Sequence, residues 1–562
     1  MADAGDNHET CGPWSSYNEA GSSKDDIVSA LNVIIEDGVV RRRRGRVIIG
    51  SPLAALSLPI TGIVEHVETD GSRVLLIGGH STDGRRAAFG RFDDSNGAFI
   101  DLGLPDPASP LLSPGFVGVS YKGNTIIADP FGRMLHYDGS KLVELVAYAG
   151  TDAGVPGART YLANPPGATL LAVWRNRVVA VLRYTVGMSA SSNDAMLSPL
   201  APAGGASTWP GSTNFDALVG TGDHVTGAAI CYDRLVLPTR RGLIEADEDA
   251  TSPIPRTRDI MNGCLAPRSV QTCSDSVIYL GDKVICRWDG SKTTVLSGPV
   301  SETLKHLHPH AAKNAVAVNY TKRKEYRIWI PVLERPELRV MLTYDYKSDR
   351  WQPPAAGWYP YDLASREAVN HPFNVTAATT ALTASHVEML LTGDAGGNLW
   401  LEDEGETDAG SIFPAYFQIG PLGTAERIET WGDWRAEVEL DGAFLQGLSI
   451  IHGTNLEQEI VRLLDGAAPE SETFATRARS DVAAGSRATH ATYSEATAWG
   501  VSPNTSKTGR KKVGSFRDRS ARLQPALMLP GYSGAQIDPT PGGIRALEIQ
   551  RRERQGGRRG GD

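Results

Sequence analysis

The chain has 562 residues, which is too many for a single hydrophobic core, so we expect two to four folded units or one large repetitive unit. Its 56 Lys and Arg against 65 Asp and Glu give a net charge of −9, which excludes a generally basic nucleic-acid binder. With 60 Gly and 34 Pro, turns are frequent, which favours short strands over long helices. No apolar run approaches the roughly 18 residues of a membrane span, so we expect a soluble chain made in a cytoplasm.

The five cysteines are sparse and form no CxxC pair. They therefore suggest neither a disulfide framework nor a zinc ribbon, and a reducing compartment is the simplest interpretation. The residues are Cys11, Cys231, Cys264, Cys273 and Cys286.

Residues 1–26 are rich in Asp, Glu, Asn, Ser and Gly, and we predict a flexible arm that orders only against a partner. Residues 27–59 predict an N-terminal β-segment, in which a strand and a turn at Asp37 and Gly38 lead to an arginine-rich strand edge. The arginines of this edge are Arg41, Arg42, Arg43, Arg44 and Arg46.

Residues 60–410 repeat one pattern, in which a short alternating β-branched run is followed by a Gly, Asp or Asn turn. Residues 135–141 (LHYDGSK) and 286–292 (CRWDGSK) are near copies, and residues 344–351 are a looser third. Asp-Gly suits a tight hairpin because Gly accepts a positive φ and Asp tolerates it. The pattern predicts an all-β fold, a β-propeller of six to eight blades of about 45 to 50 residues each.

From residue 411 to 549 the strands lengthen, and we predict a second, sandwich-like β-domain. Within it, residues 466–515 are rich in Ala, Ser and Thr, which predicts a long loop or a partner-binding insertion. Residues 550–562 form a basic stretch that we expect to be a flexible tail. Its arginines are Arg551, Arg552, Arg554, Arg558 and Arg559.

Candidate chemical sites are few. His306, His308 and His310 could offer imidazoles to a metal, but no carboxylate or Cys lies beside them, which favours a solvated loop. Asp394 begins a segment similar to the Asp-box of sialidase-like propellers, yet Trp400 comes one position late, which favours an ordinary blade hairpin. The common catalytic and nucleotide-binding motifs are missing, so we expect no enzyme activity, no catalytic residues, no metal and no cofactor.

The N-terminal arginines allow two interpretations. Guanidinium groups make strong contacts with phosphates, so Arg41 to Arg44 could bind DNA. Alternate arginines of a strand could instead pair with acidic residues of another subunit, and this interpretation is favoured. The tail arginines could likewise contact DNA or another subunit, but an unstructured end that aids solubility is the simplest interpretation.

Several segments, taken in order, resemble the β-propeller tail nozzle or packaged-DNA stabilisation proteins of short-tailed bacteriophages. The segments are residues 38–45 (GVVRRRRG), 195–199 with 207–210, 223–239, 262–270 (NGCLAPRSV) with 277–290, 344–351 and 391–400. The most telling is the 262–270 turn, which is followed by a strand and an aromatic-Asp-Gly hairpin. The resemblance covers about residues 30 to 410, and the C-terminal domain matches only vaguely.

The resemblance implies a structural virion protein in a ring, commonly a hexamer, around the DNA channel below the portal or adaptor. Expected partners are copies of the chain, the adaptor or portal, tail fibre or spike proteins and, transiently, double-stranded DNA. The ring would retain and then pass the genome. Two alternatives remain: a receptor- or glycan-binding propeller at the tail tip, and a ring or tube component of a long-tailed phage.

Overall fold

The computed structural model describes residues 7–11, 17–18, 27–81, 86–93, 97–104, 115–121, 123–128, 134–144, 168–175, 177–182, 195–197, 214–215, 223–249, 252–332, 339–355, 373–383, 386–405, 407–410, 413, 415–419, 429–439, 449–453, 489–492, 508–514, 518–520, 524–529 and 543–552. The chain divides into two compact units. One comprises Met1–Gly45, Asp349–Pro372 and Gly405–Asp562, and the other comprises Arg46–Ser348 and Phe373–Glu404.

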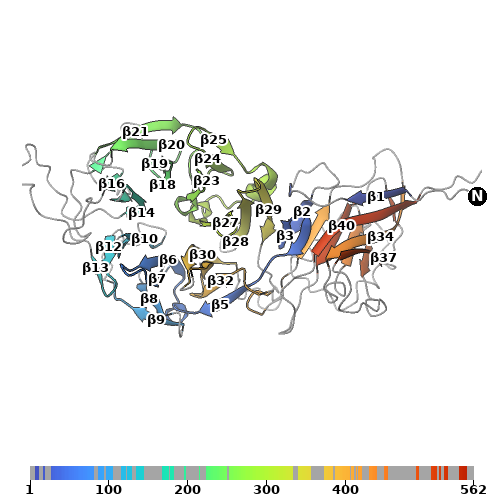
Figure 1. The fold of residues 1–562 in the computed structure, drawn as a ribbon, viewed down its shortest axis with the longest axis horizontal. Coiled ribbons are helices and arrows are strands. Elements are labelled where there is room, and N and C mark those ends of the chain that lie inside the picture. Colours follow the sequence, from blue (N-terminus) through green and yellow to red (C-terminus); the bar gives the residue numbers. More distant parts are fainter. Residues whose placement is uncertain are drawn as a thin grey trace, which may run out of the picture. The chain divides into compact units, whose positions relative to one another are not determined.

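A β-propeller accounts for most of the described strands, which form seven four-stranded antiparallel sheets (Figure 1). Blade 1 is β6 (Ile60–Val67), β7 (Arg73–His80), β8 (Ala87–Asp93) and β9 (Ala98–Asp101). Blade 2 is β10 (Val117–Tyr121), β11 (Asn124–Ala128), β12 (Met134–Tyr137) and β13 (Leu142–Glu144). Blade 3 is β14 (Ala168–Trp174), β15 (Arg177–Leu182), β16 (Ala195–Leu197) and β17 (Asn214–Phe215). Blade 4 is β18 (Ala229–Cys231), β19 (Arg234–Pro238), β20 (Leu243–Asp249) and β21 (Ser252–Asp259).

The remaining blades follow the same plan. Blade 5 is β22 (Gln271–Cys273), β23 (Ser276–Leu280), β24 (Ile285–Trp288) and β25 (Thr293–Val295). Blade 6 is β26 (Val316–Tyr320), β27 (Glu325–Pro331), β28 (Arg339–Asp345) and β29 (Arg350–Ala355). Blade 7 is β30 (Val375–Leu382), β31 (Glu388–Asp394), β32 (Leu399–Glu402) and β5 (Arg46–Gly50). The predicted all-β propeller of six to eight blades is confirmed.

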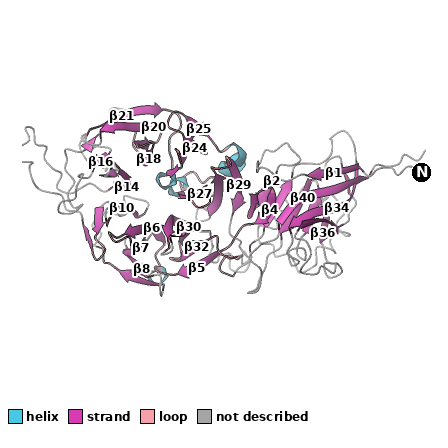
Figure 2. Ribbon diagram, in the orientation of Figure 1, coloured by secondary structure: helices cyan, strands magenta, loops and turns pink. Residues whose placement is uncertain are grey.

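The first strands of the blades form a closed circle. Each of β6, β10, β14, β18, β22, β26 and β30 contacts the first strand of the next blade, and β30 contacts β6. The circle of strands is visible face-on in Figure 2. These seven strands are therefore the innermost strands of the propeller.

The short β-branched runs of the sequence bury side chains on both faces of β11 and β15. In β11, Ile126 and Ala128 pack toward β14 and β15, whereas Ile127 packs toward blade 1. In β15, Val178 belongs to the first of these clusters and Val179 to a cluster with blade 4. Successive residues of a strand point to opposite faces, so these runs of β-branched residues fill the layers on both sides of a blade.

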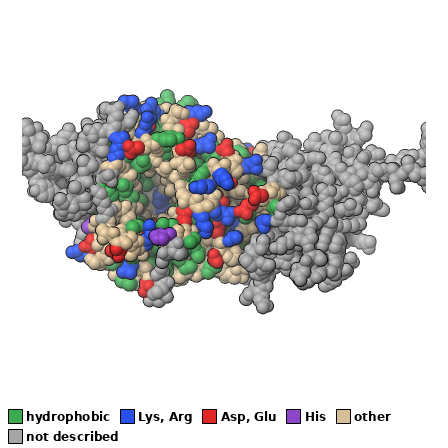
Figure 3. All heavy atoms as spheres, in the orientation of Figure 1, with side chains coloured by type: hydrophobic (Ala, Val, Ile, Leu, Met, Phe, Trp, Pro, Cys, Tyr) green, Lys and Arg blue, Asp and Glu red, His purple; other side chains and the backbone are tan. Residues whose placement is uncertain are grey.

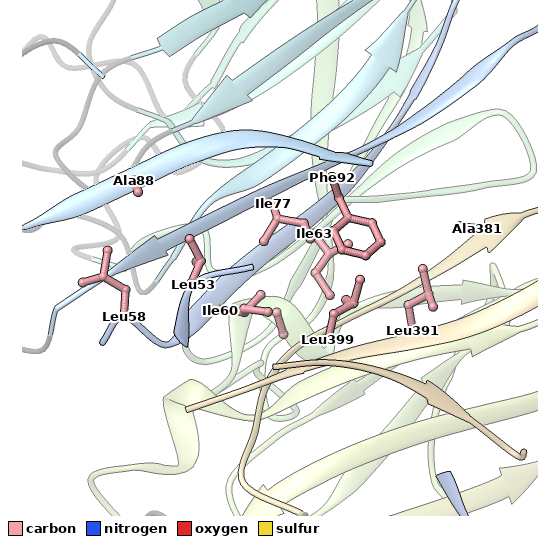
Figure 4. Packing of buried hydrophobic residues seen from close by; sticks show 11 residues of the cluster. Leu53, Leu58, Ile60, Ile63, Ile77, Ala88, Phe92, Ala381, Leu391 and Leu399 are labelled. Carbon is pink, nitrogen blue, oxygen red and sulfur yellow. The ribbon is translucent and has the colours of Figure 1, made fainter. Parts of the chain in front are cut away.

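Blade 7 joins residues from distant parts of the chain. Strand β5 pairs antiparallel with β32, so that Arg46 lies opposite Glu402 and Gly50 opposite Leu399. The adjoining core contains Leu53, Ile60, Leu391 and Leu399 (Figure 4). This unit consequently begins at Arg46, which differs from the predicted boundary at residue 60, because β5 supplies the outer strand of blade 7.

Besides β29, the described residues of the other unit form two antiparallel sheets. The larger has the order β3 (Val33–Glu36), β4 (Val39–Arg42), β40 (Gly543–Arg552), β34 (Glu429–Glu439) and β37 (Thr508–Gly514), with β1 (Asn7–Cys11) on β40 and β38 (Asp518–Ser520) on β34. The smaller has the order β2 (Ile27–Leu31), β33 (Ala415–Ile419), β39 (Gln524–Leu529), β35 (Ser449–Gly453) and β36 (Thr489–Thr492). The first and last parts of the chain thus share sheets.

This arrangement corrects four predictions from the sequence. The 1–26 arm contains β1, whose Asn7 lies opposite Arg551. Residues 27–45 belong to the sheets of the C-terminal strands and form no separate segment. The 466–515 insertion includes β36 and β37, and residues 550–552 of the expected tail belong to β40. Composition predicted a flexible arm and tail, a separate β-segment and a long loop or insertion. Strands distant in sequence provide the hydrogen-bond partners that composition cannot reveal.

Helical segments in the described residues are short. They are η1 (Ala54–Leu56), η3 (Pro267–Ser269), η4 (Gly298–Val300), α1 (Ser301–Lys305) and η5 (Ala312–Asn314). None of the helices in the described part of the chain has the length and hydropathy that a membrane crossing requires.

Gly263 offers a test of the packing before blade 5. A Cβ at this position would lie 2.1 Å from the carbonyl oxygen of Arg240, whereas Gly298 has open space around it. We expect Gly263→Ala to lower the free energy of unfolding by about 1–3 kcal/mol, because the backbone must shift. Gly298→Ala is the control, and urea denaturation measures the free energy of unfolding of both variants. An equal decrease in both would contradict the close approach of Gly263 to the Arg240 backbone.

Candidate functional site

Two of the predicted contact arginines are buried in the unit that contains β4. Arg43 makes a two-pronged ion pair with Asp408, with Nη1 to Oδ1 at 3.0 Å and Nη2 to Oδ2 at 2.6 Å. Its guanidinium also lies 3.6 Å from the centre of the Phe413 ring. Arg42 is buried too and donates to the carbonyl oxygen of Phe413. Both side chains therefore bind residues of their own chain.

Arg46 is fully buried in the propeller, where its Nη1 donates to Oε1 of Glu402 at 3.0 Å. Its guanidinium also lies over the rings of Phe373 and Trp400, at 4.6 Å and 4.2 Å from their centres. A buried charge requires a partner of this kind, because removal from water is costly. The pair fixes β5 to β32, so Arg46 has a structural role in blade 7.

Arg44 is exposed and Arg41 is partly exposed. We expected successive arginines of this strand to point to opposite faces. Instead, the neighbouring residues Arg42 and Arg43 are both buried at the end of β4. Contact with DNA or a second subunit stays a prediction for Arg41 and Arg44. Of the tail arginines, Arg551 and Arg552 lie on β40, and Arg554, Arg558 and Arg559 are outside the described residues.

The repeated aromatic-Asp segments, two of which continue with Gly, form equivalent turns between the third and fourth strands of blades 2, 5 and 6. Oδ1 of Asp138 accepts from the backbone N of Ser140 and Lys141 at 3.0 and 2.9 Å. Oδ1 of Asp289 accepts from Ser291 and Lys292, both at 2.9 Å. Gly139 and Gly290 have φ of 95° and 89°. The glycine provides the positive φ as predicted, whereas the aspartate acts as an acceptor that closes the turn.

The backbone hydrogen bond from Lys292 is the main reason that the pKa of Asp289 falls to about 2, with further hydrogen bonds from Ser291. The looser third copy forms the same kind of hydrogen bonds. Oδ1 of Asp345 accepts from the backbone N of Lys347 at 2.9 Å and of Ser348 at 3.2 Å. The repeat therefore marks a structural turn of the blade.

A buried charge network, which the sequence did not reveal, connects blade 6 to the segment after β32. Arg327 binds Asp403 through Nη1 and Nη2 at 3.0 and 2.6 Å, and its Nε donates to Glu325 at 2.7 Å. Although burial lowers it, the carboxylates of Asp403 and Glu325 raise the pKa of Arg327 well above its usual range. Glu325 and Arg327 lie two apart on one strand, which places them on one face, but Asp403 is distant in sequence.

A polar groove of about 630 Å³ lies between blades 5 and 6. It is lined by the turns that follow the first and third strands of these blades, and includes the cations Arg287, Lys324 and Lys347 and the carboxylates of Asp275 and Asp289. Tyr346 adds one aromatic ring. Such a groove is suited to a polar partner.

The remaining candidate residues either have structural roles or do not gather into a site. His308 accepts a hydrogen bond from the backbone N of Ala311, and its ring lies 6.2 Å from that of His310. Within the described ranges, no three His, Cys, Asp or Glu side chains are grouped so that they could hold a metal. Asp394 closes the β31–β32 hairpin and accepts from Nε1 of Trp400 at 2.8 Å, so the predicted blade hairpin is confirmed.

The cysteine thiols in the propeller are buried and free. Burial raises the pKa of Cys264, Cys273 and Cys286 to about 12. These three thiols therefore remain protonated near neutral pH and are poor nucleophiles.

No family model matches this chain, and no curated protein matches it. Among solved structures it is similar to YCF48 from Cyanidioschyzon merolae, at 9% identity and a TM-score of 0.33 over 61% of this chain and 95% of that one. The N-terminal domain of Nup159 gives 9% identity and a TM-score of 0.35 over 69% and 98% of the two chains. PorZ of Porphyromonas gingivalis, a component of the type-IX secretion system, gives 11% and 0.30 over 70% and 44%. Likenesses of this size carry no argument about function.

Glu402→Gln tests the role of the Arg46 pair. The variant leaves the buried guanidinium without a carboxylate, so we expect the free energy of unfolding of the propeller to fall by roughly 3 kcal/mol. The exposed Glu404→Gln is the matched control, since it removes the same charge two residues away. Thermal and urea denaturation of both variants measure the difference, and equal stability would show that the pair is dispensable.

The Asp289 turn predicts a dependence on pH. Its folded pKa is depressed from 3.8, so the carboxylate stabilises the fold above about pH 4 and loses this effect as the pH falls toward about 2. We expect Asp289→Asn to cost less than about 1 kcal/mol at pH 7, because the site is partly exposed, and to differ less from wild type at pH 2. Asp282→Asn, at an exposed residue, is the control. A stability difference between Asp289→Asn and wild type that grows as the pH falls would contradict the stabilising role of the Asp289 carboxylate.

Proposed function

We propose that the chain is a non-enzymatic structural component of a bacteriophage tail, in which copies form a ring around the DNA channel below the portal or adaptor. A closed propeller suits a structural or binding role, since its blades are fixed around one axis by packing. The observation that carries the proposal is the ordered series of segments that resembles the short-tailed phage family, with its turn at residues 262–270.

The residue types of that turn have a structural role in this fold. Cys264 and Ala266 are fully buried, and the Oγ of Ser269 donates to the Ala266 carbonyl at 2.7 Å. The same Oγ accepts from the backbone N of Leu280 at 2.9 Å. Small residues and a hydroxyl are thus required where the chain enters blade 5, which supports the resemblance at the level of the blade.

The outer strands of several blades are short, which favours contacts between copies through side chains over contacts through strand pairing. The fourth strands β9, β13, β17 and β25 are two to four residues long, so they present little edge for pairing with another strand. Neighbouring copies would therefore meet through turns and charged side chains. Arg44 is exposed and is the best placed of the N-terminal arginines for such a contact.

A receptor- or glycan-binding propeller is the second candidate. It is favoured by the groove between blades 5 and 6, which combines Tyr346 with the carboxylates of Asp275 and Asp289. Polar groups around an aromatic ring suit a carbohydrate, which offers hydroxyls and an apolar face.

Native mass spectrometry and negative-stain imaging distinguish the two candidates. A ring with a central hole, formed by the chain alone or only with portal and adaptor proteins, is the expected result. A monomer that binds host glycan and never joins a ring would favour the second candidate.

Arg44→Ser tests the proposed seam without disturbing the core, unlike changes at the buried Arg42 and Arg43. We expect ring formation to weaken by about tenfold or less, because exposed charge contacts contribute about 1 kcal/mol or less each. Arg240→Ser removes an exposed charge from the propeller and is the control. If the oligomer mass of Arg44→Ser equals that of Arg240→Ser at every concentration, Arg44 is not at a seam.

A further inference from the structure

Two arginines gather where the innermost strands of the propeller converge. Arg268, on η3 before β22, donates from Nη1 to the carbonyl oxygen of Thr61 on β6 at 3.0 Å. Strand β22 belongs to blade 5 and β6 to blade 1, which are not neighbours in the closed circle. The hydrogen bond from Arg268, at the entrance to blade 5, to Thr61 in blade 1 must therefore cross the middle of the ring. Arg268 consequently lies near the propeller axis.

Arg339 of β28 belongs to the same region. Its Nη1 donates to the carbonyl oxygen of Asn314 on η5 at 3.0 Å, and η5 contacts η3, which carries Arg268. Figure 2 shows short helical segments inside the circle of blades, and Figure 3 shows the face of the propeller hollowed near its middle, with Lys or Arg side chains inside the hollow.

The positive charge of this pair is not balanced within the described residues. None of the ion pairs formed there includes Arg268 or Arg339, in contrast to Arg43, Arg46 and Arg327. The Nε atoms of Arg268 and Arg339 are buried and have no hydrogen-bond partner in the described part of the structure. Arg339 is only 6% exposed. Each guanidinium thus keeps an Nε donor that no described acceptor satisfies.

The surroundings are consistent with an excess of positive charge. Burial lowers the pKa of Arg268 to about 10, and burial together with Arg268 lowers that of Arg339 to about 10. His80, whose Nδ1 is 2.8 Å from the hydroxyl of Thr61, has its pKa lowered to about 4 by burial and by Arg268. The imidazole is therefore neutral near pH 7 and adds no charge.

We propose that Arg268 and Arg339 form an oxyanion-binding site on the propeller axis, which takes a phosphate or carboxylate group. Arg339 is buried and Arg268 is partly exposed. A buried cation is costly without a counter-charge, and an oxyanion supplies both that charge and acceptors for the unsatisfied Nε donors. Guanidinium groups match the geometry of phosphate and carboxylate oxygens. This inference does not depend on the proposed function.

Thermal denaturation of the full chain tests the site with inorganic phosphate and acetate, each against sodium chloride of equal ionic strength. We expect at least one of the two anions to raise the Tm by about 5 °C at a hundredfold excess over its Kd. The more effective anion identifies the source, phosphate or carboxylate. The anion-dependent rise in Tm should be lost in Arg268→Gln and Arg339→Gln. It should persist in Arg240→Gln, since Arg240 is exposed.

The pKa of His80 in the wild-type chain gives a second measurement that does not require a variant to fold. An anion bound to Arg268 offsets its charge, so the pKa of His80, followed by NMR titration, should rise in the effective anion compared with chloride. The proposal is overturned if neither anion raises the Tm above that in chloride, or if both glutamine variants respond as strongly as wild type.

Discussion

The propeller depends on the pairing of β5 with β32, by which the strand before blade 1 completes blade 7. This pairing joins residues about 350 positions apart, since Arg46 donates to Glu402 across a sequence separation of 356. Such a long loop is entropically costly to close, so the contacts at the junction must be strong. A buried ion pair, two aromatic rings around the guanidinium and the apolar cluster of blades 1 and 7 all act at this one place. Each other blade depends on it, because an open circle would expose the faces of its end blades.

Much of the propeller could be predicted because its signals are local. The short β-branched runs in residues 124–128 and 177–182 predict strands, and the structure buries side chains on both faces of β11 and β15. The Asp-Gly turns were also local, although the role of the aspartate differed from the one expected. By contrast, the pairing of β1 with β40 and of β2 with β33 could not be predicted, since sheet partners distant in sequence leave no periodic signal.

The arginine run shows why composition alone misplaces a site. A run of basic residues suggests a surface contact, yet Arg42, Arg43 and Arg46 are buried because carboxylates and rings from distant segments meet them. Asp408 and Glu402 look like ordinary acidic residues in the sequence, and only the fold brings them to the arginines. Conversely, Arg268 was prominent only as part of a turn motif, although its position near the axis gives it the more unusual electrostatic environment.

The buried or partly buried arginines compared among the described residues therefore fall into two classes. Where a carboxylate is present, as for Arg43, Arg46 and Arg327, the guanidinium fastens two segments together, and its charge is neutralised within the protein. At the axis, the hydrogen bonds of Arg268 and Arg339 go to backbone carbonyls, which accept donors but carry no net charge. Carbonyl contacts can fix the position of a guanidinium, but the cost of burying its charge remains. A rigid circle of blades can sustain this cost because packing around the ring holds the arginines in place, which leaves the site ready for an anion without rearrangement.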